Sequence, residues 1–220
     1  AITGSTTVCQ GSSQTYSIGA VTGATSYTWT LPSGWSGSST TTSITATAGA
    51  SGGPISVKAN NSCGSSTPRT LSVSVTTIPA QPGSITGSTS VCQGSSQTYS
   101  ITAVSGAASY TWTLPSGWSG SSTTNSIIAT VGTTGGIISV TANNTCGSSA
   151  PRTLSVSVTA IPAQPGAITG STSVCQGSSQ TYSISSVTGA TSYTWTLPSG
   201  WSGSSTTNSI IATVGATGGT

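Results

Sequence analysis

Cysteine is the residue type in this chain with the widest chemistry, because a thiol can bind a metal, act as a nucleophile or form a disulfide. The 220 residues include five of them: Cys9, Cys63, Cys92, Cys146 and Cys175. Zinc sites need histidines or closely spaced cysteines, whereas these cysteines stand singly and the chain has no histidine. The sequence therefore predicts disulfides, and with them an oxidising, extracellular location.

The cysteines occupy two positions in a repeated pattern, which suggests how they pair. Cys63 follows Cys9 by 54 residues, and Cys146 follows Cys92 by the same interval. We expect each pair to close a loop of about 55 residues within one unit, stabilising it by roughly 4 kcal/mol. The partner of Cys175 is then expected beyond Thr220, in a longer polypeptide of which this chain is a window.

Charged side chains are almost absent, and this excludes several kinds of function. There is no Asp, Glu or His, and the only charges are those of Lys58, Arg69 and Arg152. Paired carboxylates, a Ser-His-Asp triad and a carboxylate calcium site are therefore all excluded. Three cations cannot neutralise a phosphate track, so the sequence predicts no nucleic-acid partner. The sequence predicts no enzyme activity, no cofactor and no membrane insertion.

A set of tryptophans provides the remaining candidate for specific contacts. Trp35, Trp118 and Trp201 each follow a Pro-Ser-Gly turn and lie among Ser and Gly residues. An exposed indole could stack on a sugar ring or contact a neighbouring domain, and the alternative is a second core residue of the unit. We favour the core and retain the ligand or interdomain contact as a candidate role.

The elements that must position these residues recur with a fixed period of 83 residues. The period is set by Trp29, Trp112 and Trp195, and copies two and three differ at only six positions between 85–137 and 168–220. We therefore divide the chain into repeat 1 (1–78), a Pro-rich linker (79–84), repeat 2 (85–161), a second linker (162–167) and a truncated repeat 3 (168–220). Units of this size can bury their own cores, which favours beads on a string.

Within each repeat, apolar and polar residues alternate with the period of a β-strand. Tyr27, Trp29 and Leu31 alternate with threonines and are expected in the core, and Cys63 is expected to point inward in phase with Ile55 and Val57. The extended runs of repeat 1 are 2–8, 14–18, 27–31, 41–48, 55–63 and 69–75. No window has helical periodicity, so the prediction is an all-β chain of tandem Ig-like sandwiches with about seven strands each.

Four strings of repeat 1 resemble the PKD-like, Ig-fold repeats of large secreted proteins of Bacteroidota. They are Val8-Cys9-Gln10-Gly11, Gln14-Thr15-Tyr16, Tyr27 to Trp35 and Asn60 to Gly64. The acidic residue of the PKD family proper is missing after the Tyr-x-Trp motif, so the resemblance is to the PKD-like branch. It implies a cell-surface adhesin of the type IX secretion kind, without a catalytic site.

These observations give one leading function and two alternatives. The leading hypothesis is a non-catalytic spacer in an extracellular adhesin or stalk, whose partners are the neighbouring repeats of the same long chain. The first alternative is a self-assembling filament, because the net charge of +3 offers little resistance to lateral contact between copies. The second is a weak glycan-binding module that uses the second tryptophan of each repeat.

Overall fold

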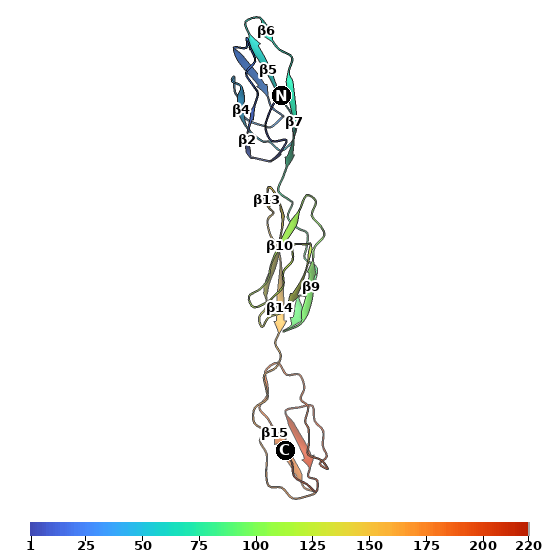
Figure 1. Cartoon of the computed structure of the whole chain (residues 1–220). Helices are drawn as coiled ribbons and strands as arrows, with labels where there is room; N and C mark the ends of the chain where they lie inside the picture. The colour runs from blue at the N-terminus through green and yellow to red at the C-terminus, as the bar shows by residue number, and fades with distance from the viewer. Residues whose placement is uncertain (220) are drawn as a thin grey trace.

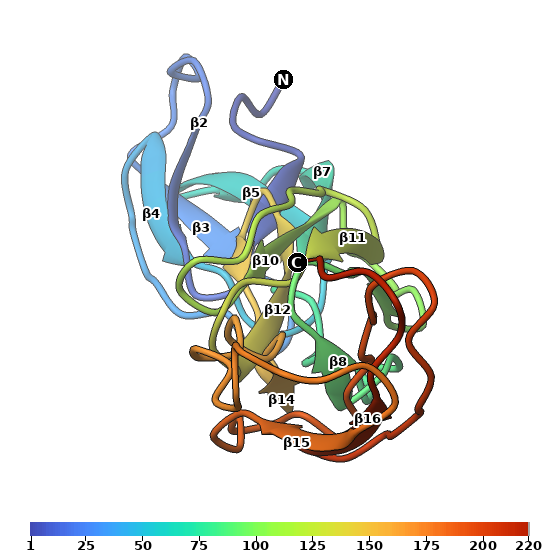
Figure 2. The same cartoon turned by 90° about the horizontal axis from the view of Figure 1, so that it is seen from below.

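The computed structural model describes residues 1–219 as a row of β-rich units joined end to end by short linkers, with the N-terminus in the first unit and the C-terminus in the last (Figure 1). Seen from below, along the row, the units overlap in projection (Figure 2), and the side view shows that they follow one another without folding back (Figure 1). No helix occurs in residues 1–219, and hence none that could cross a membrane. The predicted all-β class is confirmed.

Repeat 1 contains seven strands, as its alternating sequence predicts. They are β1 (Thr7–Cys9), β2 (Ser13–Ser17), β3 (Ser26–Thr30), β4 (Ser43–Thr47), β5 (Gly53–Asn61), β6 (Gly64–Ser65) and β7 (Arg69–Thr76). One sheet has the order β1-β7-β5-β3, with β6 paired to β5, and β2 pairs with β4 in a second sheet. All neighbours are antiparallel except β1 and β7, which run parallel.

Repeat 2 reproduces this topology strand for strand. Its strands are β8 (Ser90–Cys92), β9 (Ser96–Ser100), β10 (Ser109–Thr113), β11 (Ser126–Thr130), β12 (Gly136–Asn144), β13 (Gly147–Ser148) and β14 (Arg152–Thr159). The larger sheet has the order β8-β14-β12-β10, and β9 pairs with β11. Among the described residues, repeat 3 has one strand pair, β15 (Ser179–Ser183) with β16 (Ser209–Thr213). Thr220 lies outside the described residues.

Repeats 1 and 2 each have a separate apolar core between their two sheets. In repeat 1 the core contains Tyr16, whose side chain is wholly buried, with Ile44 beside it on β4 of the same sheet and Ile55 on β5 of the other sheet. The equivalent core of repeat 2 contains Tyr99, Ile127 and Ile138. Because no core cluster includes residues of both repeats, each repeat provides its own hydrophobic stabilisation.

One prediction about side-chain direction was wrong, that of Cys63. Tyr27 is buried as expected, Trp29 and Leu31 are half-buried and pack against the core, and Trp35, beyond the turn, is buried in it. Cys63 is exposed, because β5 ends at Asn61 and the chain turns through Ser62 and Cys63 into β6. The period-2 pattern therefore applies only up to Asn61, and the cysteine lies on a turn.

The buried tyrosines predict how the stability of these units depends on pH. Burial raises the pKa of Tyr16 and Tyr99 above the ordinary value near 10, because the folded chain disfavours the phenolate. The unfolded chain then releases these protons first, so the free energy of unfolding is fully present below about pH 10 and falls above it. Denaturant titrations from pH 8 to 11 check this, and replacing both tyrosines by Phe should weaken the alkaline decline.

Candidate functional site

The two cysteine positions of a repeat lie at its opposite ends. Cys9 is the last residue of β1 and lies beside Thr76, the last residue of β7, because these strands run parallel. This end faces the linker that follows, and we call it the trailing end. Cys63 lies in the turn between β5 and β6, beyond the start of β7. We call this opposite end the leading end.

The predicted disulfide within repeat 1, between Cys9 and Cys63, is therefore wrong, and so is the one between Cys92 and Cys146. From Thr76 to Arg69 along β7 and then from Val57 to Asn61 along β5, the chain spans roughly 35 Å at about 3.3 Å per residue. A disulfide requires Cα atoms within about 7 Å. Cysteines at the two ends of one repeat cannot meet.

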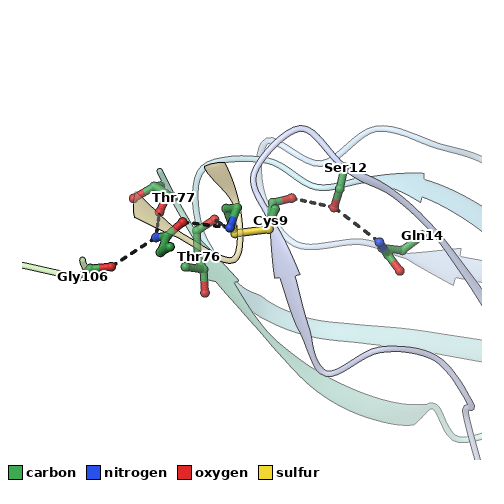
Figure 3. Close-up of a disulfide and its surroundings, with 8 residues drawn as sticks. Cys9, Ser12, Gln14, Thr76, Thr77 and Gly106 are labelled. Atoms are coloured by element: carbon green, nitrogen blue, oxygen red, sulfur yellow. Dashed lines mark hydrogen bonds between the residues drawn. A yellow bond between two sulfur atoms is a disulfide. The ribbon is translucent and has the colours of Figure 1, made fainter. Parts of the chain in front are cut away.

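The disulfide instead joins the two repeats. Cys9, at the trailing end of repeat 1, is bonded to Cys146, at the leading end of repeat 2, with their Cα atoms 5.4 Å apart and 137 positions apart in the sequence. Figure 3 shows the sulfur bridge at the end of β1, close to Thr76 and Thr77. In the described residues Cys63, Cys92 and Cys175 are free and exposed. The disulfide is therefore a feature of the junction.

Hydrogen bonds hold the turn around Cys146 against the end of repeat 1. The side-chain amide of Asn144 donates to the carbonyl oxygen of Thr77, at 2.8 Å, and to that of Gly106, at 3.2 Å (Figure 3). Its carbonyl oxygen accepts from the backbone N–H of Cys146, at 2.8 Å. One asparagine thus positions the cysteine and binds the preceding repeat.

The linker between the repeats is packed against repeat 2. Both of its prolines, Pro79 and Pro82, are buried. The Gln81 side chain donates to the carbonyl oxygen of Pro151, at 2.8 Å, and Nε of Arg152 donates to that of Pro82, at 2.9 Å. With no carboxylate in the chain, the guanidinium binds backbone oxygen. The linker is therefore part of the folded junction.

The same residues elsewhere in the chain show what the junction adds. Pro162 and Pro165, which correspond to Pro79 and Pro82, are exposed in the second linker. Arg69 and Ser66 of repeat 1 are also exposed, whereas Ser149 of repeat 2 is buried. The residues of the first junction are thus less exposed than their counterparts elsewhere in the described chain.

The tryptophans proposed for ligand or interdomain contact lie inside their own units. Trp35 and Trp118 are buried, and their indole N–H groups donate to Ser51 and Thr134 of the same repeat. The Trp35 ring lies 6.4 Å from that of Tyr16, centre to centre. Trp201 has the same arrangement and is partly buried. The structure thus gives all three rings a core position, and no sugar platform is formed by Trp35 or Trp118.

The residues that sequence reasoning missed are Asn144, Gln81 and Arg152. The recurrence of an arginine directly after proline, at Arg69 and Arg152, is the signal in the sequence that could have identified one of them. The contact of this arginine with a linker is seen at Arg152, which binds Pro82, whereas Arg69 is exposed.

Replacing Arg152 by Ala should loosen the junction. The hydrogen bond from the guanidinium to Pro82 is charge-assisted, so its loss should lower the effective concentration of Cys9 for Cys146 by roughly five- to tenfold. The measurement is the thiol–disulfide equilibrium of this pair against glutathione. Arg69→Ala is the matched control, because Arg69 has the same place in repeat 1 and no linker to hold; equal effects of the two changes would contradict the assignment.

Comparison with solved structures places these units among Ig-like folds. A marsupial T cell receptor has a TM-score of 0.50 at 13% identity, with 98% of this chain and 93% of the receptor chain covered. The Escherichia coli adhesin FdeC matches 99% of this chain and 88% of its own, at 16% identity and a TM-score of 0.41. The I9–I11 tandem of titin is 9% identical, with 99% of this chain and 90% of the titin chain covered, and has a TM-score of 0.38. No curated protein sequence matches the chain.

The sequence itself identifies the family. The family model described as the PKD-like domain matches three successive segments, residues 1–73, 78–156 and 161–220. The segments follow the 83-residue period, and together they span nearly the whole chain. This chain of tandem Ig-like sandwiches therefore belongs to the PKD-like domain family.

Proposed function

We propose that the chain is a length-setting, non-catalytic segment of an extracellular surface adhesin or stalk, which holds a distal binding region away from the cell. The observation that carries this proposal is the junction, where a disulfide and a packed linker fix one repeat on the end of the next. A spacer needs defined connections of this kind, and its length grows with each added copy.

Composition and fold support the same function. Ig-like and PKD-like repeats are typically non-catalytic and extracellular, and the chain has no Asp, Glu or His for acid–base chemistry. A disulfide between exposed elements persists in an oxidising compartment. The near identity of copies two and three favours a role in which units are interchangeable.

The test is to insert or delete whole repeats in the full-length surface protein and to measure both reach and adhesion. We expect a tag at the distal end to move by a constant increment of roughly 35 Å or more per repeat, with attachment retained. Attachment that depends on particular repeats, or purified repeats that bind the substratum themselves, would contradict a spacer.

A self-assembling filament is the alternative that needs a separate measurement. Ile128 and Ile211 are exposed on the outer faces of β11 and β16, and the net charge of +3 gives weak repulsion between copies. Sedimentation of the purified chain, with its free cysteines blocked, distinguishes the two functions. A spacer sediments as an elongated monomer at all concentrations, whereas a filament subunit grows with concentration.

A further inference from the structure

The Cys9–Cys146 disulfide closes a covalent ring that includes most of two repeats. The cysteines are 137 positions apart, so 136 residues lie between them. These residues include β2 to β7, the linker and β8 to β12. Only Ala1 to Cys9 and the chain from Cys146 onward lie outside the ring or at its edge.

We propose that this disulfide is a tension bypass. When the two ends of the chain are pulled apart, the covalent path runs along residues 1–9, across the sulfur bridge and along residues 146–220. The 136 residues inside the ring lie off this path and cannot be drawn out while the bridge is intact. The bond between the repeats thereby keeps all of these residues off the loaded path, whereas a disulfide within each repeat would leave residues 64–91, with β7 and the linker, under load.

The loaded path between Cys146 and Cys175 is already nearly extended. It follows β13, β14, the second linker and the first residues of repeat 3, in 29 residue steps. Strands already rise about 3.3 Å per residue, close to the limit of about 3.3–3.6 Å for a fully stretched chain. β14 extends lengthwise through repeat 2, hydrogen-bonded to β12 and β8. The loaded segment is thus extended before any force is applied.

The same arrangement is available at every junction of this type. Cys92 and Cys175 correspond to Cys9 at trailing ends, and Cys63 corresponds to Cys146 at a leading end. Cys92 lies beside Thr159 as Cys9 lies beside Thr76. Because Cys92 falls inside the first ring, bridges at successive junctions would overlap. Two staggered covalent tracks would then run through the array, and each 29-step segment from one bridge to the next would span two successive repeats.

The leading end of repeat 1 already has the shape that this requires. A hollow of about 290 Å³ lies beside Cys63 and is lined by Gly23, Asn61 and Gly64 among others. The equivalent residues of repeat 2 are those that contact the end of repeat 1, where Asn144 binds Thr77 and Gly147 faces Ile78. A trailing end of the same sequence is thus the occupant that fits. These mechanical consequences hold whatever the distal end of the protein binds.

The experiment is single-molecule stretching of the 220-residue chain by its two ends. In the oxidised chain, residues 10–145 should contribute no extension. Reduction by a dithiol transfers two electrons to the bridge, yields two cysteine thiols and a cyclic disulfide, and should release about 480 Å of additional contour length, at about 3.5 Å per residue.

Substitutions identify which bridge is responsible. Cys9→Ser should release the same length without a reductant, whereas Cys63→Ser should change nothing. Reduction and reoxidation of single wild-type molecules provide the same comparison if the Cys9→Ser chain fails to fold. Full extension of the oxidised chain, or release of a shorter loop by Cys63→Ser, would overturn the proposal.

Discussion

Trp35→Ala should unfold repeat 1 while leaving repeat 2 folded. The indole is buried, lies 6.4 Å from the Tyr16 ring and donates to Ser51. Removing a buried tryptophan costs about 3–5 kcal/mol, which is a large share of the 5–15 kcal/mol that stabilises a whole domain. Because the two cores are separate, denaturant unfolding should show one early transition and one unchanged transition.

Trp29→Ala is the matched control in the same repeat. Trp29 is half-buried, and its indole donates to Thr41, so its removal should cost much less than that of Trp35. Circular dichroism and fluorescence during denaturant titration measure both variants. A Trp35→Ala chain with an unchanged midpoint and a lost sugar affinity would contradict the core assignment and restore the glycan-binding alternative.

Gly87→Ala should have a comparable effect on repeat 2 for a different reason. Gly87 has φ of +149°, and a Cβ there would lie 2.3 Å from Cδ1 of Tyr99 and 3.0 Å from the carbonyl oxygen of Thr98. Tyr99 is wholly buried and its hydroxyl donates to Ser88, so the ring has nowhere to move. Backbone strain and overpacking together should cost about 2–5 kcal/mol.

Gly94→Ala separates strain from packing. Gly94 has φ of +75°, but no atom lies within 4 Å of the position that its Cβ would take. Its substitution should therefore cost only the backbone term, about 1–2 kcal/mol. Thermal or denaturant unfolding of both variants gives the difference, and equal losses would show that Tyr99 yields to the added methyl group.

Local sequence patterns were sufficient to predict the bounds of individual strands. The alternation at 14–18 and 69–75 corresponds to β2 and β7 within one residue at each end, because each of these strands has one buried face and ends at a turn. The period of 83 residues likewise predicted separate cores. Alternation failed at Cys63, where a turn interrupts the strand. The turn-forming residues Asn61, Ser62 and Gly64 are the local signal for this turn.

The pairing of the cysteines could not be predicted from spacing. In a repeated sequence, a bridge within a unit and a bridge between neighbouring units use the same two positions, so the intervals between cysteines do not distinguish them. The distinction depends on which end of the sandwich each position occupies. That end is set by the parallel pairing of β1 with β7, a long-range contact with no local signature.

The junction residues were hidden for a related reason. Asn61 and Asn144, or Arg69 and Arg152, are identical residues at equivalent positions. In the described chain, however, only Asn144 binds a preceding repeat and only Arg152 binds the linker before its own repeat. Their function belongs to the contact between units. A reading of one repeat alone assigns them to the surface.

A count of free thiols tests the central claim, that the disulfide joins repeats and does not close a loop within one. The oxidised chain is unfolded in denaturant with a maleimide, and the labelled cysteines are identified by mass spectrometry, with a fully reduced sample as the control. The structure predicts three labels, on Cys63, Cys92 and Cys175, and five after reduction. A single label, on Cys175, would mean that each complete repeat closes its own disulfide and would contradict the account.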